Sequence, residues 1–112
     1  MFFTIKDVFG SGKSMYQIRE RYDQLDSSPF TNIDILGSFV DNHDNARFLS
    51  QWSDPNKFKN ALLFALTARG IPFFYYGDEQ GFSGGNDPEN RESLWDKMDT
   101  SSDMYKYVAT IN

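Results

Sequence analysis

The feature that most constrains the fold is a strand-helix-strand pattern in the middle of the chain. Residues 33–40 form an apolar run without alternation, which is typical of a strand covered on both faces. Asp54-Pro55 predicts the start of a helix, Gly70 its end, and the aromatic residues 72–77 a second strand. Because a helical crossover returns the chain in the same direction, the pattern predicts two parallel strands.

Two further segments predict helices on either side of this unit. Before it, Met15, Ile18, Tyr22 and Leu25 recur at a helical spacing; after it, Met104, Tyr107, Val108 and Ile111 do the same. The expected order is helix, strand, helix, strand, helix, which is an α/β fold. Two parallel strands cannot close a sheet or bury both of its faces, so we expect the chain to be part of a larger domain.

The charge and the cysteine content exclude several classes of function. The net charge of −5 repels phosphate backbones, so we do not expect nucleic acid as a partner. No segment approaches the roughly 20 apolar residues that span a bilayer, so we do not expect a membrane partner either. The chain has no cysteine, which excludes disulfides and thiolate metal sites.

Polar residues follow both predicted strands. Asp41-Asn42-His43-Asp44-Asn45 follows the first strand, and Asp78-Glu79-Gln80 follows the second. Because parallel strands end on the same side, we expect the two clusters to converge on one rim. Such a density of hydrogen-bonding groups suits a polyhydroxylated ligand such as a sugar, and close carboxylates suit acid-base or charge-stabilising work. A metal site is less well supported, since there is one histidine and no calcium-loop glycine.

A phosphate-binding loop is a remote alternative. Gly12-Lys13-Ser14 resembles the end of such a loop before a helix, but Asp7 occupies the position where the loop needs its first glycine. The simpler interpretation is that Ser11 or Ser14 caps a helix.

Three motifs resemble the alpha-amylase family of glycoside hydrolases. Residues 36–48 (LGSFVDNHDNARF) resemble its strand-seven motif, and residues 70–80 (GIPFFYYGDEQ) its strand-eight motif. Residues 84–92 (GGNDPENRE), with Trp95, are similar to fungal-type alpha-amylases. The resemblance implies that residues 1–112 are the carboxyl-terminal part of a (β/α)8 TIM barrel, from the helix before strand seven to the helix after strand eight, with no second domain.

The resemblance also implies roles for individual residues. Asp44 matches the third catalytic carboxylate, which binds sugar hydroxyls and favours the oxocarbenium-like transition state. His43 matches a residue that hydrogen-bonds the same sugar ring, and Asp87 and Arg91 match a pair that holds more distant glucose units. Arg47 is expected to be a structural partner of the acids of the site.

The activity implied for the complete protein is hydrolysis, with retention, of internal α-1,4 bonds in starch, glycogen or maltooligosaccharide. The family's nucleophile and general acid lie on earlier strands that this chain does not contain, so we expect the isolated chain to be inactive and its partner to be the rest of the barrel. The family also implies secretion, no cofactor within this chain, and calcium as a possible ligand of the full-length protein.

Ala46 stands where fungal-type enzymes usually have proline, and the cysteine common before their strand seven is absent. Two alternatives stay open beside the amylase interpretation. One is a related α-glucosidase or transglycosylase, and the other is a non-catalytic remnant that binds carbohydrate.

Overall fold

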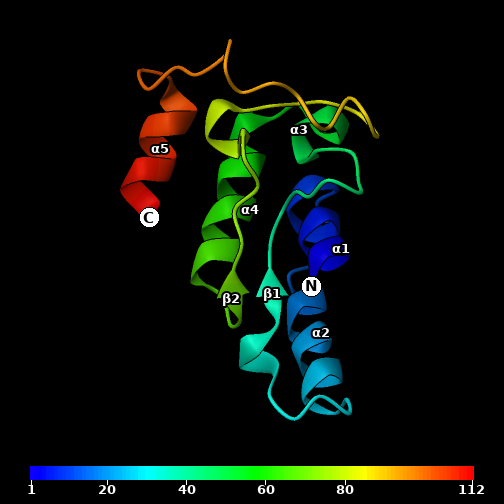
Figure 1. Ribbon diagram of the computed structural model, residues 1–112. Helices are drawn as coiled ribbons and strands as arrows, with labels where there is room; N and C mark the ends of the chain where they lie inside the picture. The colour runs from blue at the N-terminus through cyan, green and yellow to red at the C-terminus, as the bar shows by residue number, and fades with distance from the viewer.

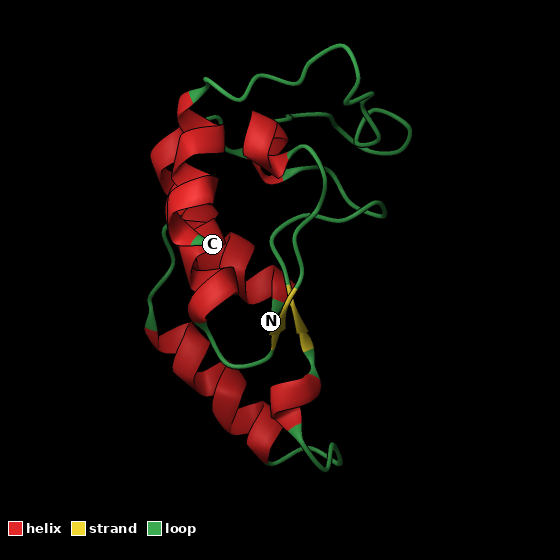
Figure 2. Ribbon diagram, turned by 60° about the vertical axis from the view of Figure 1, so that its left-hand side comes forward, coloured by secondary structure: helices red, strands yellow, loops and turns green.

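The computed structural model describes residues 1–112 as a group of helices beside two short parallel strands (Figures 1 and 2). The amino-terminal half contains α1 (Phe2–Ile5), a π-helical turn (Lys6–Gly10), α2 (Tyr16–Asp26), a 3-10 turn (Ile33–Ile35) and β1 (Gly37–Ser38). The carboxyl-terminal half contains α3 (Phe48–Gln51), α4 (Pro55–Thr67), β2 (Ile71–Pro72), a 3-10 turn (Asp78–Gln80) and α5 (Asp103–Ile111).

The three predicted helices, α2, α4 and α5, are confirmed. The start of α4 follows the predicted chemistry, because Asp54 Oδ1 accepts a hydrogen bond from Asn56 N at 2.8 Å and Pro55 occupies the first turn. At the start of α5, Ser102 Oγ accepts a hydrogen bond from Tyr105 N at 3.2 Å.

The parallel pairing of the two strands is also confirmed, but their predicted lengths are wrong. Gly37 pairs with Ile71, and the pairing hydrogen bonds run from Ile71 N to Leu36 O at 2.9 Å and from Phe73 N to Ser38 O at 2.8 Å. Residues 33–35 form a 3-10 turn because Asn32 Oδ1 accepts the Asp34 N–H at 2.9 Å. Each strand has a single neighbour, so little of either segment is held in a sheet ladder.

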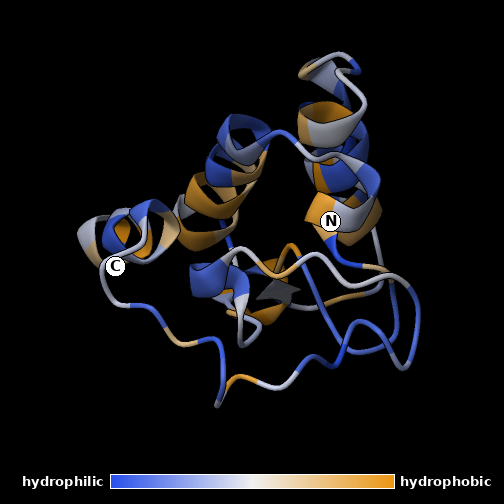
Figure 3. Ribbon diagram, turned by 90° about the horizontal axis from the view of Figure 1, so that it is seen from above, coloured by the Kyte–Doolittle hydropathy of each residue, from blue (hydrophilic) through white to orange (hydrophobic).

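The core lies between α4 and the elements around it. In the view from above, α4 lies between α5 and the amino-terminal helices (Figure 3). Phe48 and Phe58 stack with ring centroids 5.4 Å apart. The eight core residues come from α1, the segment after β1, α3, α4 and α5: Ile5, Val40, Phe48, Phe58, Ala61, Leu62, Ala65 and Met104. Val40 directly precedes the polar cluster, so this core fixes the base of the candidate site.

Many large apolar side chains remain exposed around the strands. Only 22 of the 112 residues are buried, while Ile71, Phe73 and Phe74 of the β2 segment and Ile35 before β1 are exposed. This pattern agrees with the expectation that two strands cannot bury both faces of a sheet. None of the helices is long and apolar enough to cross a membrane.

The segment before Gly12 contradicts the phosphate-loop alternative. A phosphate-binding loop follows a strand, whereas residues 2–10 are helical here. Lys13 Nζ lies 3.0 Å from Asp7 Oδ1, so the candidate phosphate-binding lysine is paired with a carboxylate. Ser14 Oγ accepts a hydrogen bond from Tyr16 N at 3.3 Å at the start of α2, which supports the simpler capping interpretation.

Candidate functional site

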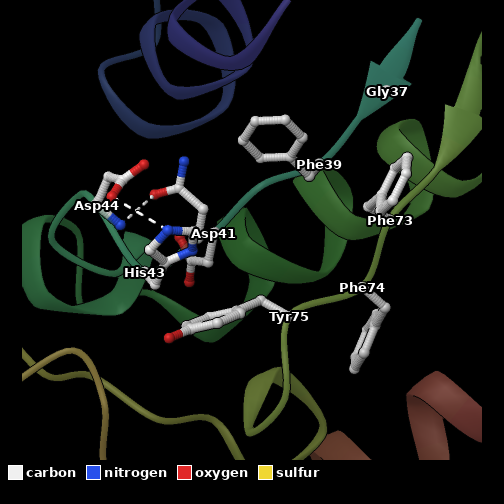
Figure 4. Close-up of a pocket in the computed structure, with 9 residues that line it drawn as sticks. Gly37, Phe39, Asp41, His43, Asp44, Phe73, Phe74 and Tyr75 are labelled. Atoms are coloured by element: carbon white, nitrogen blue, oxygen red, sulfur yellow. Dashed lines mark hydrogen bonds and ion pairs between the residues drawn. The ribbon is translucent and has the colours of Figure 1, made fainter.

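The segments that follow the two strands border one pocket of about 500 Å³. In Figure 4, Asp41, His43 and Asp44 lie toward one side with the Tyr75 ring beneath His43, while Phe39, Phe73 and Phe74 spread across the other. The residues lining the pocket are Gly37, Phe39, Asp41, Asn42, His43, Asp44, Phe73, Phe74 and Tyr75. The segments after the two strands therefore meet at one pocket, as expected. The second polar cluster does not line it, because Asp78 is buried and Glu79 faces α5 instead.

His43 and Asp44 lie next to each other on this rim. His43 Nε2 is 3.2 Å from Asp44 Oδ1, and the two side chains are 63% and 69% exposed. Both side chains are therefore open to a ligand in the pocket.

The turn that carries these two residues is shaped by Asn42. Its Oδ1 accepts hydrogen bonds from Asp44 N at 3.1 Å, from Asn45 N at 3.1 Å and from Asn45 Nδ2 at 3.0 Å. This side-chain-to-backbone turn is a local structure that asparagine forms readily. It fixes the backbone at Asp44 without using the Asp44 carboxylate.

Arg47 lies fully buried beneath the rim and joins three segments. Its Nε donates to Glu92 Oε2 at 2.6 Å, its Nη1 to Asp78 Oδ1 at 3.2 Å and its Nη2 to Tyr76 O at 3.0 Å. The guanidinium also lies over the Tyr75 ring, 4.5 Å from its centroid. The predicted role of Arg47 as a structural partner of the acids is confirmed.

A second group of buried charges lies beside Arg47. Lys6 Nζ donates to Ala46 O at 2.6 Å and lies 3.6 Å from Asp41 Oδ1, which accepts the Phe48 N–H at 2.8 Å. Burial raises the pKa of the Asp41 carboxyl, although Lys6 opposes the shift. Burial also lowers the pKa of Lys6, because it disfavours the charged ammonium.

Asp78 is the most perturbed acid of this group. Burial raises the pKa of Asp78 well above its usual value, and the nearby negative charge of Asp41 raises it further. The backbone brings Asp78 inward at Gly77, where φ is +85° and a side chain would collide with the Phe82 ring. Glu79 Oε2 accepts the Gly77 N–H at 2.9 Å, so Glu79 helps to shape this bend.

The loop of residues 83–92 places Arg91 against the turn that carries His43, with Asp87 beside Arg91, although neither side chain lines the pocket. Arg91 Nε lies 2.9 Å from Asp87 Oδ1, and both side chains are about half exposed. Arg91 Nη2 also donates to His43 O at 3.4 Å. The structure therefore brings together all four residues that the sequence singled out: His43, Asp44, Asp87 and Arg91.

Two further residues hold this loop, and neither was predicted from the sequence. Asn90 is fully buried and donates to backbone carbonyls of the 42–45 turn, and Glu92 accepts hydrogen bonds from Ser83 N and Gly84 N. Both stand in an acidic, glycine-rich segment typical of a solvated loop, so nothing in the sequence indicates their burial.

No three histidine, aspartate or glutamate side chains come together in a group that could hold a metal ion. Asp41, Asp78 and Asp87 are instead paired with lysine, arginine or a backbone N–H group, and Asp44 lies beside His43.

Comparisons with known proteins identify the family. Residues 6–111 match the family model described as "Alpha amylase, catalytic domain". Over 120 aligned residues the chain is 43% identical to the Beta/alpha-amylase of Paenibacillus polymyxa, which covers 100% of this chain and 10% of that protein. Over 71 residues it is 46% identical to the cyclomaltodextrin glucanotransferase of Bacillus sp. (strain 1011), which covers 63% of this chain and 10% of that protein.

A solved structure supports the same assignment. The alpha-amylase from Malbranchea cinnamomea superposes with a TM-score of 0.90 at 33% identity, over 98% of this chain and 24% of that one. The chain therefore spans about a quarter or less of the lengths of these relatives. The catalytic domain of this family is a (β/α)8 barrel, and two parallel strands with a helical crossover are a part of such a barrel. The chain belongs to the alpha-amylase family of glycoside hydrolases, as a fragment of its catalytic domain.

Proposed function

We propose that this chain is part of an alpha-amylase that hydrolyses internal α-1,4 bonds of starch or glycogen with retention. The observation that carries the proposal is the exposed pair His43 and Asp44 on the rim of a pocket with aromatic side chains opposite. Hydroxyl groups of a sugar can bind the polar side of this pocket, while the aromatic side offers apolar surface to the sugar ring. Asp44 stabilises the positive charge of the oxocarbenium-like transition state, and His43 hydrogen-bonds the same sugar.

Retaining hydrolysis also needs a nucleophile and a general acid about 5 Å apart. We propose that both come from strands of the barrel outside residues 1–112. Calcium, where the complete protein uses it, would be held there too, since the acids of this chain do not gather around one point.

The exposed apolar surface beside β1 and β2 supports the proposal that further strands of the barrel lie outside residues 1–112. Ile71, Phe73 and Phe74 need neighbouring strands to cover them, and the proposed neighbours are the other strands of the barrel. In this arrangement β1 is strand seven, β2 is strand eight, and residues 1–112 belong to a single catalytic domain.

Residues 1–112 on their own are expected neither to cleave starch nor to unfold cooperatively. Two strands and a small core leave too much apolar surface in water for an all-or-none transition. Differential scanning calorimetry and a reducing-sugar assay test this. A sharp melting transition would contradict it, because the chain would then be a complete domain.

A chimera supplies the missing strands and tests the proposed function. In it, residues 1–112 replace the matching segment of the Malbranchea cinnamomea alpha-amylase, which aligns with 98% of this chain. We expect the chimera to hydrolyse starch and to release sugars in the α-anomeric form, as NMR of the fresh products would detect. A folded chimera that does not hydrolyse starch would contradict the proposal.

In the chimera, Arg91→Ala is expected to raise KM for long maltooligosaccharides about 10-fold, with little change for short ones. The reason is the proposed contact of Asp87 and Arg91 with distant glucose units, since one hydrogen bond to a charged group contributes about 1.5–3 kcal/mol when it is formed fully. The measurement is kcat and KM over a series of chain lengths.

Arg19→Ala is the matched control, because Arg19 and Asp23 form another exposed pair four residues apart, at 4.0 Å on α2. An equal rise in KM for both variants, or for substrates of every length, would contradict the assigned contact.

The second candidate function is transglycosylation, which the match to a cyclomaltodextrin glucanotransferase favours. Such an enzyme would transfer the glycosyl group to a sugar rather than to water, and its products with starch would be cyclic or lengthened. Chromatography of the chimera's products distinguishes the two. An α-glucosidase would release mainly glucose, and a non-catalytic carbohydrate-binding remnant would show binding in a titration without any product.

A further inference from the structure

Asn90 lies directly behind the turn that carries Asp44. Its side chain is fully buried, and its Nδ2 donates to His43 O and to Asn45 O, both at 2.9 Å. These two carbonyls belong to the residues on either side of Asp44 in the chain. One side chain therefore holds the backbone on both sides of the candidate catalytic carboxylate.

The chemistry of these contacts requires an amide at position 90. Both partners are carbonyl oxygens, so the side chain must present two N–H donors, which asparagine has and aspartate lacks. Asn90 Oδ1 is buried without a hydrogen-bond partner. The two hydrogen bonds donated by Nδ2 therefore define what this side chain does for the turn.

Asn90 is itself held by a rigid loop. Glu92 Oε1 accepts the N–H groups of Ser83 at 3.1 Å and Gly84 at 2.8 Å, which closes the 83–92 loop on itself. Glu92 Oε2 accepts from buried Arg47 at 2.6 Å, and Arg47 N donates to Gly84 O at 3.1 Å. The loop is thus anchored to the core before it reaches the turn.

Two asparagines bind the backbone of the turn, one through its N–H groups and the other through its carbonyl groups. Asn42 Oδ1 accepts the N–H groups of Asp44 and Asn45, while Asn90 Nδ2 donates to the carbonyls of His43 and Asn45. These hydrogen bonds hold the backbone of the turn in one conformation. The Asp44 carboxylate makes none of them and stays free for a ligand.

We propose that Asn90 is a positioning residue for Asp44. By holding the backbone carbonyls of His43 and Asn45, Asn90 fixes the place of the Asp44 carboxylate in the pocket. The inference rests on the proposed function, in which Asp44 stabilises the transition state. Asn90 touches no substrate in this proposal and acts only through the 42–45 turn. Correct placement matters because a shift of about 1 Å at a reacting group can lower a rate by about 10²-fold.

The test is Asn90→Asp in the chimera, a change that keeps the size and shape of the side chain. A carboxylate at this place would face two carbonyl oxygens and repel them, so the turn should shift. We expect kcat to fall about 10- to 100-fold, with a much smaller change in KM, because the substrate is still bound by the rest of the site. Asn60→Asp, on the exposed face of α4, is the matched control and should leave both constants unchanged.

The pH dependence separates positioning from a general loss of structure. A protonated carboxyl can donate one hydrogen bond to one of the two carbonyls, and burial favours this neutral form. The loss of kcat in Asn90→Asp, relative to the unsubstituted chimera, should therefore become smaller as the pH falls. The loss of kcat in Asn90→Ala should not change with pH.

The outcomes distinguish the inference from the proposed function. If the unsubstituted chimera is active, and Asn90→Asp retains its kcat or shows a deficit that is constant with pH, Asn90 is not a positioning residue. A loss of rate fully accounted for by unfolding, as melting curves would reveal, also overturns the inference. If the unsubstituted chimera is folded but inactive on starch, the proposed function itself fails.

Discussion

Asp44→Asn in the chimera is expected to lower kcat for starch by at least about 10²-fold, as the loss of a preorganised transition-state contact does. The substitution keeps the size of the side chain but removes the negative charge. That charge is needed only when the sugar ring becomes positive, so kcat should fall much more than KM rises. Initial rates over a range of starch or maltoheptaose concentrations would measure the two constants separately.

Asp96→Asn is the control for this prediction, because Asp96 is exposed on the loop that follows Trp95. It removes the same charge from an exposed position that does not line the pocket, and it should leave kcat within about 2-fold, because surface substitutions away from a site usually have small effects. Wild-type turnover in Asp44→Asn would show that Asp44 is not the transition-state carboxylate.

Arg47→Met is expected to destabilise the chimera by about 3–5 kcal/mol, the cost of removing one partner from a buried ion pair. Methionine fills much of the same space, so the effect isolates the charge and the hydrogen bonds. Without Arg47, the buried Asp78 carboxyl and Tyr76 O lose their donors, and Glu92 loses the anchor that joins its loop to the core. Equilibrium unfolding in urea would measure the change.

Arg69→Met is the matched control for Arg47→Met. Arg69 also contacts two carboxylates, Asp26 and Asp34, but these ion pairs are exposed to solvent, so its removal should destabilise the chimera far less than the removal of Arg47. Equal losses for the two variants would contradict the idea that Arg47 organises the rim.

The helices could be predicted from sequence because their signals are local. The Asp54-Pro55 start of α4 and the apolar spacing within α2 and α5 depend only on nearby residues, and these helices are found as expected. Strand lengths could not be predicted in the same way, because a strand exists only where a neighbour accepts its hydrogen bonds. Residues 33–40 contain enough apolar side chains for a long strand, but only Gly37–Ser38 has a partner.

The candidate site was predictable to the extent that it depends on the direction of the strands. Parallel strands place their carboxyl ends together, which brings the residues after Val40 close to Asp78. The role of Asn90 depends instead on how a loop folds over the turn 45 to 47 residues earlier in the chain. No local pattern encodes such a contact, and the polar composition around Asn90 suggests exposure.

The single pairing of β1 and β2 also has a consequence for handling the protein. Each strand has an open edge of unpaired N–H and C=O groups, and apolar side chains such as Ile71 and Phe73 stand exposed beside it. Open edges of this kind recruit strands from other molecules and promote aggregation. Residues 1–112 produced alone would meet many copies of themselves before any natural neighbour, so co-synthesis with the missing strands is the route to soluble material.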